Sequence, residues 1–115
     1  MVRSGYLLLA FLLACTAAFS QDVFEGVERI VAVADVHGGY EELVGILRSA
    51  GLIDNKNRWK GGRAHLVQCG DILDRGPASR KVMDLLMDLE GEAQRAGGRV
   101  HLLLGNHEVM NIYGD

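Results

Sequence analysis

Three short clusters of acid, imidazole and amide side chains in this 115-residue chain have the residue types of a metal site. The clusters are ADVHGG at residues 34–39, GDILDRG at residues 70–76 and GNHE at residues 105–108. Carboxylate, imidazole and amide oxygen together form a hard and borderline donor mixture that suits manganese, iron or zinc. The candidate metal ligands are Asp35, His37, Asp71 and Asn106.

The spacing of these ligands indicates chemistry on phosphate. Asp35 and His37 are two residues apart, so in an extended segment their side chains point the same way and can reach one ion. Asp71, from another cluster, can bridge to a second ion. Two metal ions about 3.5–4 Å apart can clamp a phosphoryl group and generate hydroxide at neutral pH.

Two further side chains extend this interpretation. Arg75 offers a planar fork to phosphate oxygens, and His107 can serve as a general acid toward a leaving group. Asp-x-His alone is a weak signal, whereas GDILDRG and GNHE, each after an apolar run, are much more specific. Glu108 has two open interpretations, a site residue or an acid that stabilises a helix start.

Predicted strands and helices alternate along the chain and position these clusters. Residues 29–34, 63–69 and 99–104 are predicted strands, and helices are predicted over 40–50 and from Pro77 onward. The apolar spacing predicts one buried stripe on each helix: Tyr40, Leu43, Val44, Leu47 and Ala50 on the first, and Val82, Leu85, Leu86, Leu89 and Ala93 on the second. This βαβαβ order predicts a parallel α/β sheet with right-handed crossovers and helices on both faces. The carboxyl ends of parallel strands share one edge, so the three clusters should converge there.

The remaining candidate residues are assigned structural roles. Trp59 is expected to anchor the polar loop 53–62 on the body of the domain. His65 and His101 lie inside strand patterns, away from the clusters, and are predicted to be structural. Cys69 is expected to be a small buried hydrophobic residue, which is common for a free thiol.

The three motifs resemble the signature of the calcineurin-like metallophosphoesterase superfamily, in its phosphoprotein phosphatase branch. The flanking segments VQCGDILDRGP and LLLGNHEVMNIYGD are most similar to the bacterial Shewanella-like phosphatases. The resemblance covers about residues 27–115. It implies an α/β fold, the N-terminal βαβαβ part of a truncated calcineurin-like metallophosphoesterase sandwich.

The resemblance also implies the metal ligands. Asp35 and His37 would bind the first ion, Asp71 would bridge both ions, and Asn106 would bind the second. The implied cofactors are two divalent or trivalent ions, manganese first, with iron or zinc as alternatives.

Catalytic roles follow by the same resemblance. Arg75 would hold the phosphate, with Asn106 and His107 also facing the substrate. His107 would be the proton donor, oriented by Asp74. The implied reaction is hydrolysis of phosphomonoesters, phosphoproteins among them, by attack of a metal-bound hydroxide without a phosphoenzyme.

The sequence departs from the family pattern in two ways. Ala34 replaces the first-motif glycine, which would cause strain if that position needs a positive φ. The family's two later histidine ligands have no counterpart before Asp115, so the isolated chain is expected to be inactive. Alternatives are a dinucleoside tetraphosphate hydrolase, whose motif usually lacks the equivalent of Asp74, and a non-catalytic, metal-binding remnant.

The first twenty residues are typical of a targeting segment. Arg3 precedes the apolar run 6–14, and small residues precede a predicted signal-peptide cleavage site after Ser20. The alternative is a lipoprotein signal cleaved before Cys15, whose lipid would be the only predicted membrane contact. Export to the periplasm or the extracellular space follows, with residues 21–115 as the phosphoesterase part. The net charge of −3 indicates no nucleic-acid partner.

Overall fold

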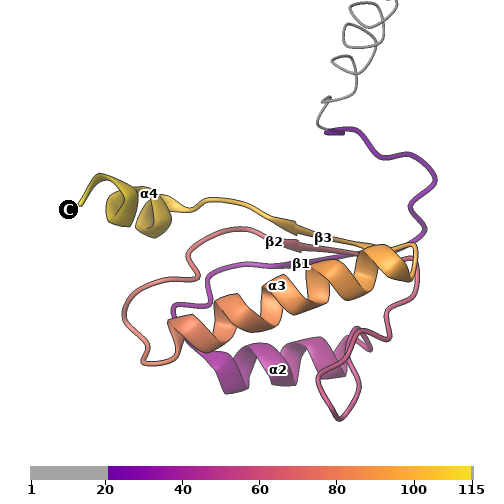
Figure 1. Ribbon diagram of the computed structural model, residues 1–115, viewed down its shortest axis with the longest axis horizontal. Helices are drawn as coiled ribbons and strands as arrows, with labels where there is room; N and C mark the ends of the chain where they lie inside the picture. Colours follow the sequence, from indigo (N-terminus) through magenta and orange to yellow (C-terminus); the bar gives the residue numbers. More distant parts are fainter. Residues whose placement is uncertain (1–20, 115) are drawn as a thin grey trace, which may run out of the picture.

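The computed structural model describes residues 21–114, so the predicted signal segment 1–20 lies outside the described residues. Three parallel strands form one sheet in the order β1-β2-β3 (Figure 1). The strands alternate with helices, which confirms the predicted βαβαβ order. The elements are β1 (Ile30–Val33), α2 (Tyr40–Ser49), β2 (His65–Gln68), α3 (Ser79–Arg95), β3 (Arg99–Leu102) and α4 (Asn106–Tyr113).

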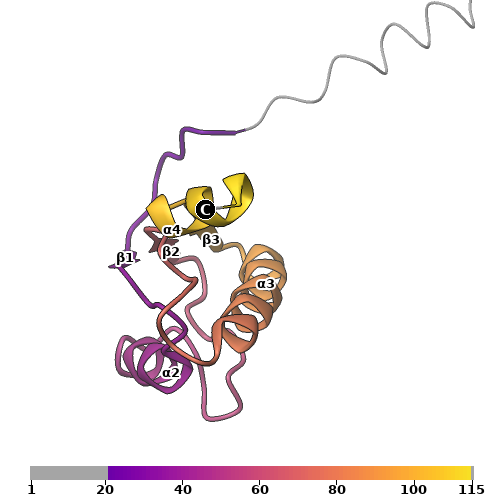
Figure 2. The same cartoon turned by 90° about the vertical axis from the view of Figure 1, so that its left-hand side faces the viewer.

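Helices α2 and α3 lie on the same face of the sheet and pack against each other (Figures 1 and 2). The prediction of helices on both faces is therefore wrong for residues 21–114. The strands join the sheet in chain order, so each right-handed crossover returns on the same side. The opposite face carries exposed apolar side chains such as Ile30, which is 63% exposed.

This one-sided cover also overturns the expectation for Cys69, which is exposed. Side chains along a strand alternate between the two faces of the sheet. Leu66 and Gln68 of β2 are fully buried beneath the helices, which places the next side chain, Cys69, on the open face.

The core lies between the sheet and the two helices. Helix α2 buries Leu43, Val44 and Leu47, and the other two residues of the predicted stripe, Tyr40 and Ala50, are partly buried against the same core. Gly51, just beyond this helix, has a φ of +70° and so ends it in a left-handed conformation. The predicted stripe of α3 is also confirmed, because its buried residues are Val82, Leu85, Leu86, Leu89 and Ala93.

The loop before β2 is anchored by Trp59, as predicted. The Trp59 side chain packs against the hydrophobic core, and its Nε1 donates a 3.0 Å hydrogen bond to the carbonyl of Gly62. Its backbone N–H donates to Glu92 Oε2 of α3 at 2.7 Å. Ile53 and Trp59 also form an isolated antiparallel bridge that closes the base of the loop.

His65 and His101 form a structural pair on the face opposite the helices. Nδ1 of His65 lies 3.0 Å from Nε2 of His101, and the Phe24 ring lies edge-on to both imidazoles. Burial, followed by the charges of His101 and Arg99, lowers the pKa of His65. Their mutual contact, away from the three clusters, agrees with the structural interpretation. Among helices of residues 21–114, none has the length and apolar character needed to span a bilayer.

Candidate active site

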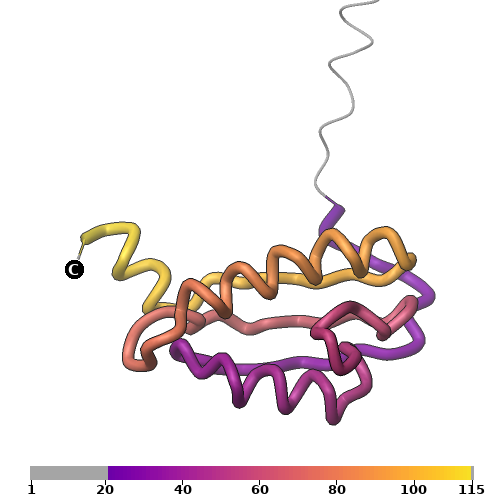
Figure 3. The backbone as a smooth tube through the Cα atoms, turned by 60° about the horizontal axis from the view of Figure 1, so that its bottom comes forward, coloured from indigo at the N-terminus to yellow at the C-terminus, as the bar shows by residue number. Residues whose placement is uncertain are grey.

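The segments that follow the three strands meet at one end of the sheet (Figure 3). Backbone hydrogen bonds join the first two segments: the N–H groups of Val36 and His37 both donate to the Asp71 carbonyl at 2.9 Å. Gly38 N–H donates to the Ile72 carbonyl at 2.8 Å. The predicted convergence of the first two clusters is therefore present in the fold.

Asp35, His37 and Asp71 form a possible metal site. Each offers one ligand atom, and these atoms all lie within 4.8 Å of one another. Oδ2 of Asp35 lies 3.6 Å from Nε2 of His37. Nδ1 of His37 contacts the Leu73 carbonyl at 2.9 Å, which leaves Nε2 as the ligating nitrogen. Such an outer hydrogen bond is the usual way to orient a metal-binding imidazole.

The local backbone differs from the extended segment that the Asp-x-His spacing suggested. His37 lies in a turn with a φ of 44°, so it does not continue the strand geometry of β1. The two side chains nevertheless converge, because the turn brings the imidazole back toward Asp35. The expected convergence of the two side chains therefore arises from a different local conformation.

Asn106, the first residue of α4, turns its side-chain amide toward Asp71. With its nitrogen on that side, the amide donates at 3.0 and 3.2 Å to the two Asp71 carboxylate oxygens. With its oxygen on that side, two acceptors face each other and a cation between them would relieve the repulsion. A carboxylate, an imidazole and an amide oxygen within reach of one another fit a divalent metal ion.

Backbone strain gathers at these residues. Of the non-glycine residues in 21–114, five have a positive φ, and four of the five are predicted site residues. Each such conformation costs on the order of 1–3 kcal/mol and persists only where surrounding contacts enforce it. Ala34 is not among the five, so alanine in place of the first-motif glycine causes no such strain. The four are His37 (44°), Asp71 (54°), Asp74 (68°) and Arg75 (64°).

Glu108 supplies the contacts that enforce the second loop. Its buried carboxylate accepts hydrogen bonds from the N–H groups of Asp71 (2.7 Å), Ile72 (2.6 Å) and Leu73 (3.1 Å). Gly105 N–H donates to the same carboxylate at 2.9 Å. Burial alone would raise the pKa of Glu108, but these four donors lower it below its usual value. Glu108 therefore holds the loop that carries Asp71.

Two glycines allow the second and third loops to touch. A Cβ at Gly70, whose φ is +93°, would overlap the backbone nitrogen of Gly105. A Cβ at Gly105 would overlap Oδ1 of Asp71. Only glycine at both positions permits this approach without moving Asp71.

His107 lies between the possible metal site and Asp74. Its Nδ1 is 3.0 Å from Oδ2 of Asp74, and its backbone N–H donates to Oδ1 of Asp71 at 3.0 Å. The rings of His37 and His107 are edge-to-face, with centroids 4.7 Å apart. The predicted His107–Asp74 pair is thus assembled beside the possible metal ligands.

Asn111 is a neighbour of this pair that the sequence motifs did not predict. Its Nδ2 donates at 2.8 Å to Oδ2 of Asp74, the oxygen that also faces His107. The hydrogen bond from His107, and then the one from Asn111, lowers the pKa of Asp74. The position of Asn111 in the sequence could have indicated this contact, because Asn111 is four residues after His107 and therefore on the same helix face.

Arg75 is exposed, and the structure does not draw its side chain into the cluster. Within the described part of the chain, its guanidinium has no hydrogen-bond or ion-pair partner. A guanidinium without a protein partner is available to a ligand.

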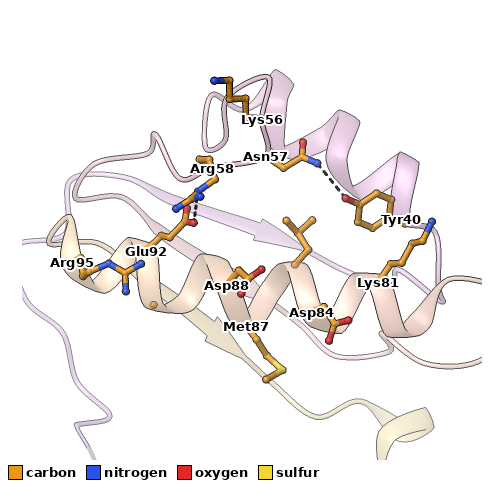
Figure 4. Close-up of a pocket in the computed structure, with 12 residues that line it drawn as sticks. Tyr40, Lys56, Asn57, Arg58, Lys81, Asp84, Met87, Asp88, Glu92 and Arg95 are labelled. Carbon is orange, nitrogen blue, oxygen red and sulfur yellow. Dashed lines mark hydrogen bonds and ion pairs between the residues drawn. The ribbon is translucent and has the colours of Figure 1, made fainter.

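A pocket of about 770 Å³ lies elsewhere, between α3, the start of α2 and the loop before β2. Its walls carry the Arg58–Glu92 ion pair (2.6 Å) and the hydrogen bond from Asn57 to the Tyr40 hydroxyl (3.1 Å; Figure 4). None of the predicted site residues lines it. The predicted catalytic residues at the strand ends therefore lie outside this pocket.

Known proteins are similar to this chain in sequence and fold. Residues 28–115 match the model of the calcineurin-like phosphoesterase family. Shewanella-like protein phosphatase 2 of Arabidopsis thaliana is 48% identical over 95 residues, which are 83% of this chain and 24% of that protein. A symmetrical bis(5'-nucleosyl)-tetraphosphatase of Buchnera aphidicola is 34% identical over 80 residues, covering 70% of this chain and 24% of that protein.

A solved crystal structure is also similar to this chain in sequence and fold. The crystal structure of the cold-active protein-tyrosine phosphatase of a psychrophilic Shewanella species superposes with a TM-score of 0.77 at 41% identity. The match covers 80% of this chain and 28% of that one, so the chain spans about a quarter of the length of these relatives. The family match, the shared fold and the converging motifs lead to one conclusion: this chain belongs to the calcineurin-like phosphoesterase family.

Proposed function

We propose that this chain is the N-terminal part of a phosphomonoesterase that uses two metal ions. One observation carries the proposal: ligand atoms of Asp35, His37 and Asp71 lie within 4.8 Å of one another. The imidazole of His107 lies directly beside them, 4.7 Å from that of His37 between ring centroids. This juxtaposition suits a phosphate held at metal ions with a proton donor at its side.

The proposed metal ligands are those of the three clusters. Asp35 and His37 would hold the first ion, Asp71 would be shared between the two ions, and Asn106 would hold the second. Bound metal ions would neutralise phosphate charge and lower the pKa of a water molecule. The mixed oxygen and nitrogen ligands favour manganese, with iron or zinc as alternatives.

The chain's own residues then handle phosphate and proton. A water molecule that has lost a proton to solvent forms the bond from its oxygen to phosphorus, and the bond from phosphorus to the leaving oxygen breaks with its electron pair on that oxygen. Arg75 binds phosphate oxygens through its planar fork, and Asn106 and His107 face the same group. His107 Nε2 gives its proton to the leaving oxygen, while Nδ1 stays directed at Asp74.

The proposed substrates are phosphomonoesters, phosphoproteins among them. The names of the relatives, a protein phosphatase and a protein-tyrosine phosphatase, support this class. Dinucleoside tetraphosphates are the alternative substrate, because one of the relatives is named a bis(5'-nucleosyl)-tetraphosphatase. The intact Asp74 favours phosphomonoesters, because the motif of the tetraphosphatases usually lacks that acid. Assay of both substrate types with one enzyme preparation decides between them.

Activity is proposed to need more than these 115 residues, because the chain spans about a quarter of its relatives. Sequencing the gene beyond codon 115 tests this. An open frame that supplies two further histidines near strand ends supports the enzyme proposal. A stop codon at that point would instead support the metal-binding remnant without catalysis.

The decisive assay uses the full-length protein and p-nitrophenyl phosphate. Chelation should abolish turnover, and added manganese should restore it. Asp71→Asn should lose at least about a hundredfold in kcat, because one shared ligand serves both ions. Asp84→Asn is the matched control, since Asp84 is an exposed acid on α3 whose side chain pairs, within residues 21–114, with Arg80 alone. Full turnover after chelation, or equal activity of the two variants, would refute the proposal.

We also propose that the protein is exported, on the basis of residues 1–20, which lie outside the described range. N-terminal sequencing of the mature protein from its source cell tests it. A first residue of Gln21 supports the signal peptide, and a lipid-modified Cys15 supports the lipoprotein alternative. Retention of Met1 in the cytoplasm would contradict both.

A further inference from the structure

Asn111 is held in a single orientation beside the proposed proton donor. It lies one turn after His107 in α4, and its Nδ2 donates to the His107 carbonyl at 2.8 Å. The same nitrogen donates to Oδ2 of Asp74 at 2.8 Å. An amide nitrogen has two N–H groups, so both are used and rotation of the amide is opposed.

Few contacts hold the side chain of Asp74. Asp74 lies in the exposed loop between β2 and α3, with a φ of 68°, next to Arg75 with a φ of 64°. In residues 21–114, its side chain contacts only two hydrogen-bond donors, His107 Nδ1 (3.0 Å) and Asn111 Nδ2 (2.8 Å). Both donors come from α4, so this helix sets the position of the carboxylate.

We propose that Asn111 is a positioning residue that fixes Asp74 against Nδ1 of His107 and so directs Nε2 of His107 toward the leaving oxygen. This role rests on the proposed function of the site. In this role Asn111 acts through Asp74 and His107 and not by binding phosphate or a metal ion itself. Its two hydrogen bonds tie the carboxylate to the same helix turn that carries the imidazole.

The role has a chemical signature, because proton donation matters more as the leaving group becomes more basic. When the bond between phosphorus and the leaving oxygen breaks, that oxygen takes both bonding electrons. A nitrophenolate tolerates this charge, whereas a phenolate, whose conjugate acid has a pKa of about 10, needs the proton from His107 Nε2. A misdirected imidazole should therefore slow phenyl phosphate selectively.

The test compares Asn111→Ala and Asn111→Asp with the unchanged full-length protein, on phenyl phosphate and p-nitrophenyl phosphate. We expect kcat for phenyl phosphate to fall by about tenfold to a hundredfold, and kcat for p-nitrophenyl phosphate by less than about threefold. KM should stay unchanged, because the interaction acts in the transition state. Asn111→Asp should be at least as slow, because it places a second negative charge beside Asp74.

Two controls separate positioning from a structural defect. Alanine has a higher helix propensity than asparagine, so Asn111→Ala should not weaken α4 itself. In a His107→Ala background, Asn111→Ala should have no further effect on phenyl phosphate, because there is no imidazole left to direct.

The outcomes separate a failure of the proposed function from a failure of the role of Asn111. An unchanged protein that hydrolyses neither ester with metal ions present overturns the proposed function, and this role falls with it. An active protein whose Asn111 variants slow both esters equally, or neither ester, overturns the role of Asn111 alone. A full additional loss in the His107→Ala background would do the same.

Discussion

The carboxylate of Glu108 accepts a hydrogen bond of 2.6 Å from the backbone N–H of Ile72, 36 residues away in the chain. This contact, with those to the neighbouring N–H groups of Asp71 and Leu73, binds the start of α4 to the loop after β2. Two of the three motifs are therefore joined by one buried side chain. The relative position of these two motifs depends on the charge and shape of the Glu108 side chain.

Replacing Glu108 by glutamine should destabilise the protein. The variant keeps the shape, but its amide NH₂ group faces backbone donors and leaves them unpaired. We expect the free energy of unfolding to fall by about 1.5–3 kcal/mol, the usual range for hydrogen bonds to a charged group. Urea denaturation measures it. Glu90→Gln, at an exposed position on α3, is the control, and equal stability of the two variants would contradict this role.

The same carboxylate should make stability depend on acid pH. The pKa of Glu108 in the folded protein is lowered from its ordinary value of 4.5, so the unfolded chain binds a proton first as pH falls. Its stabilisation should be complete above pH 4.5 and should be lost as pH falls through the folded pKa. Urea midpoints measured from neutral pH to about pH 3 should show this loss. A Glu108→Gln variant with the same slope would rule out Glu108 as its source.

Gly105→Ala should weaken metal binding, because its Cβ would overlap Oδ1 of Asp71 and move that ligand. A loss of about tenfold to a hundredfold in affinity for manganese is expected by calorimetry, the usual effect of disturbing a ligand's support. The control is Gly45→Ala in α2, where an added Cβ meets open space. That variant should gain up to about 1 kcal/mol in stability and bind metal normally. Unchanged affinity in Gly105→Ala would show that the loops adapt.

Ala34→Gly should bring no gain, although glycine is the family residue at this position. Ala34 does not have a positive φ, so there is no backbone strain for glycine to relieve. The variant should bind manganese with unchanged affinity and lose up to about 1 kcal/mol of stability through a more flexible unfolded chain. Tighter metal binding by the glycine variant, measured by the same calorimetry, would be the contrary result.

The sequence alone predicted the order of strands and helices as far as β3 and most of the residues that meet at the strand ends, whereas helix α4 was not predicted. The correct predictions were possible because apolar periodicity is local, and because parallel strands with right-handed crossovers have one common carboxyl edge. The buried stripes of α2 and α3 are confirmed for the same reason. The motif residues carried enough chemistry to indicate a metal site before any contact was known.

Only the tertiary structure decided which face each element covers and what holds the loops in place. Periodicity does not state strand order, and the order β1-β2-β3 put both helices on one side and left Cys69 exposed. The carboxylate of Glu108 and the amide of Asn111 find their partners more than thirty residues away. Such hydrogen bonds depend on three-dimensional proximity between loops, which no local pattern along the chain records.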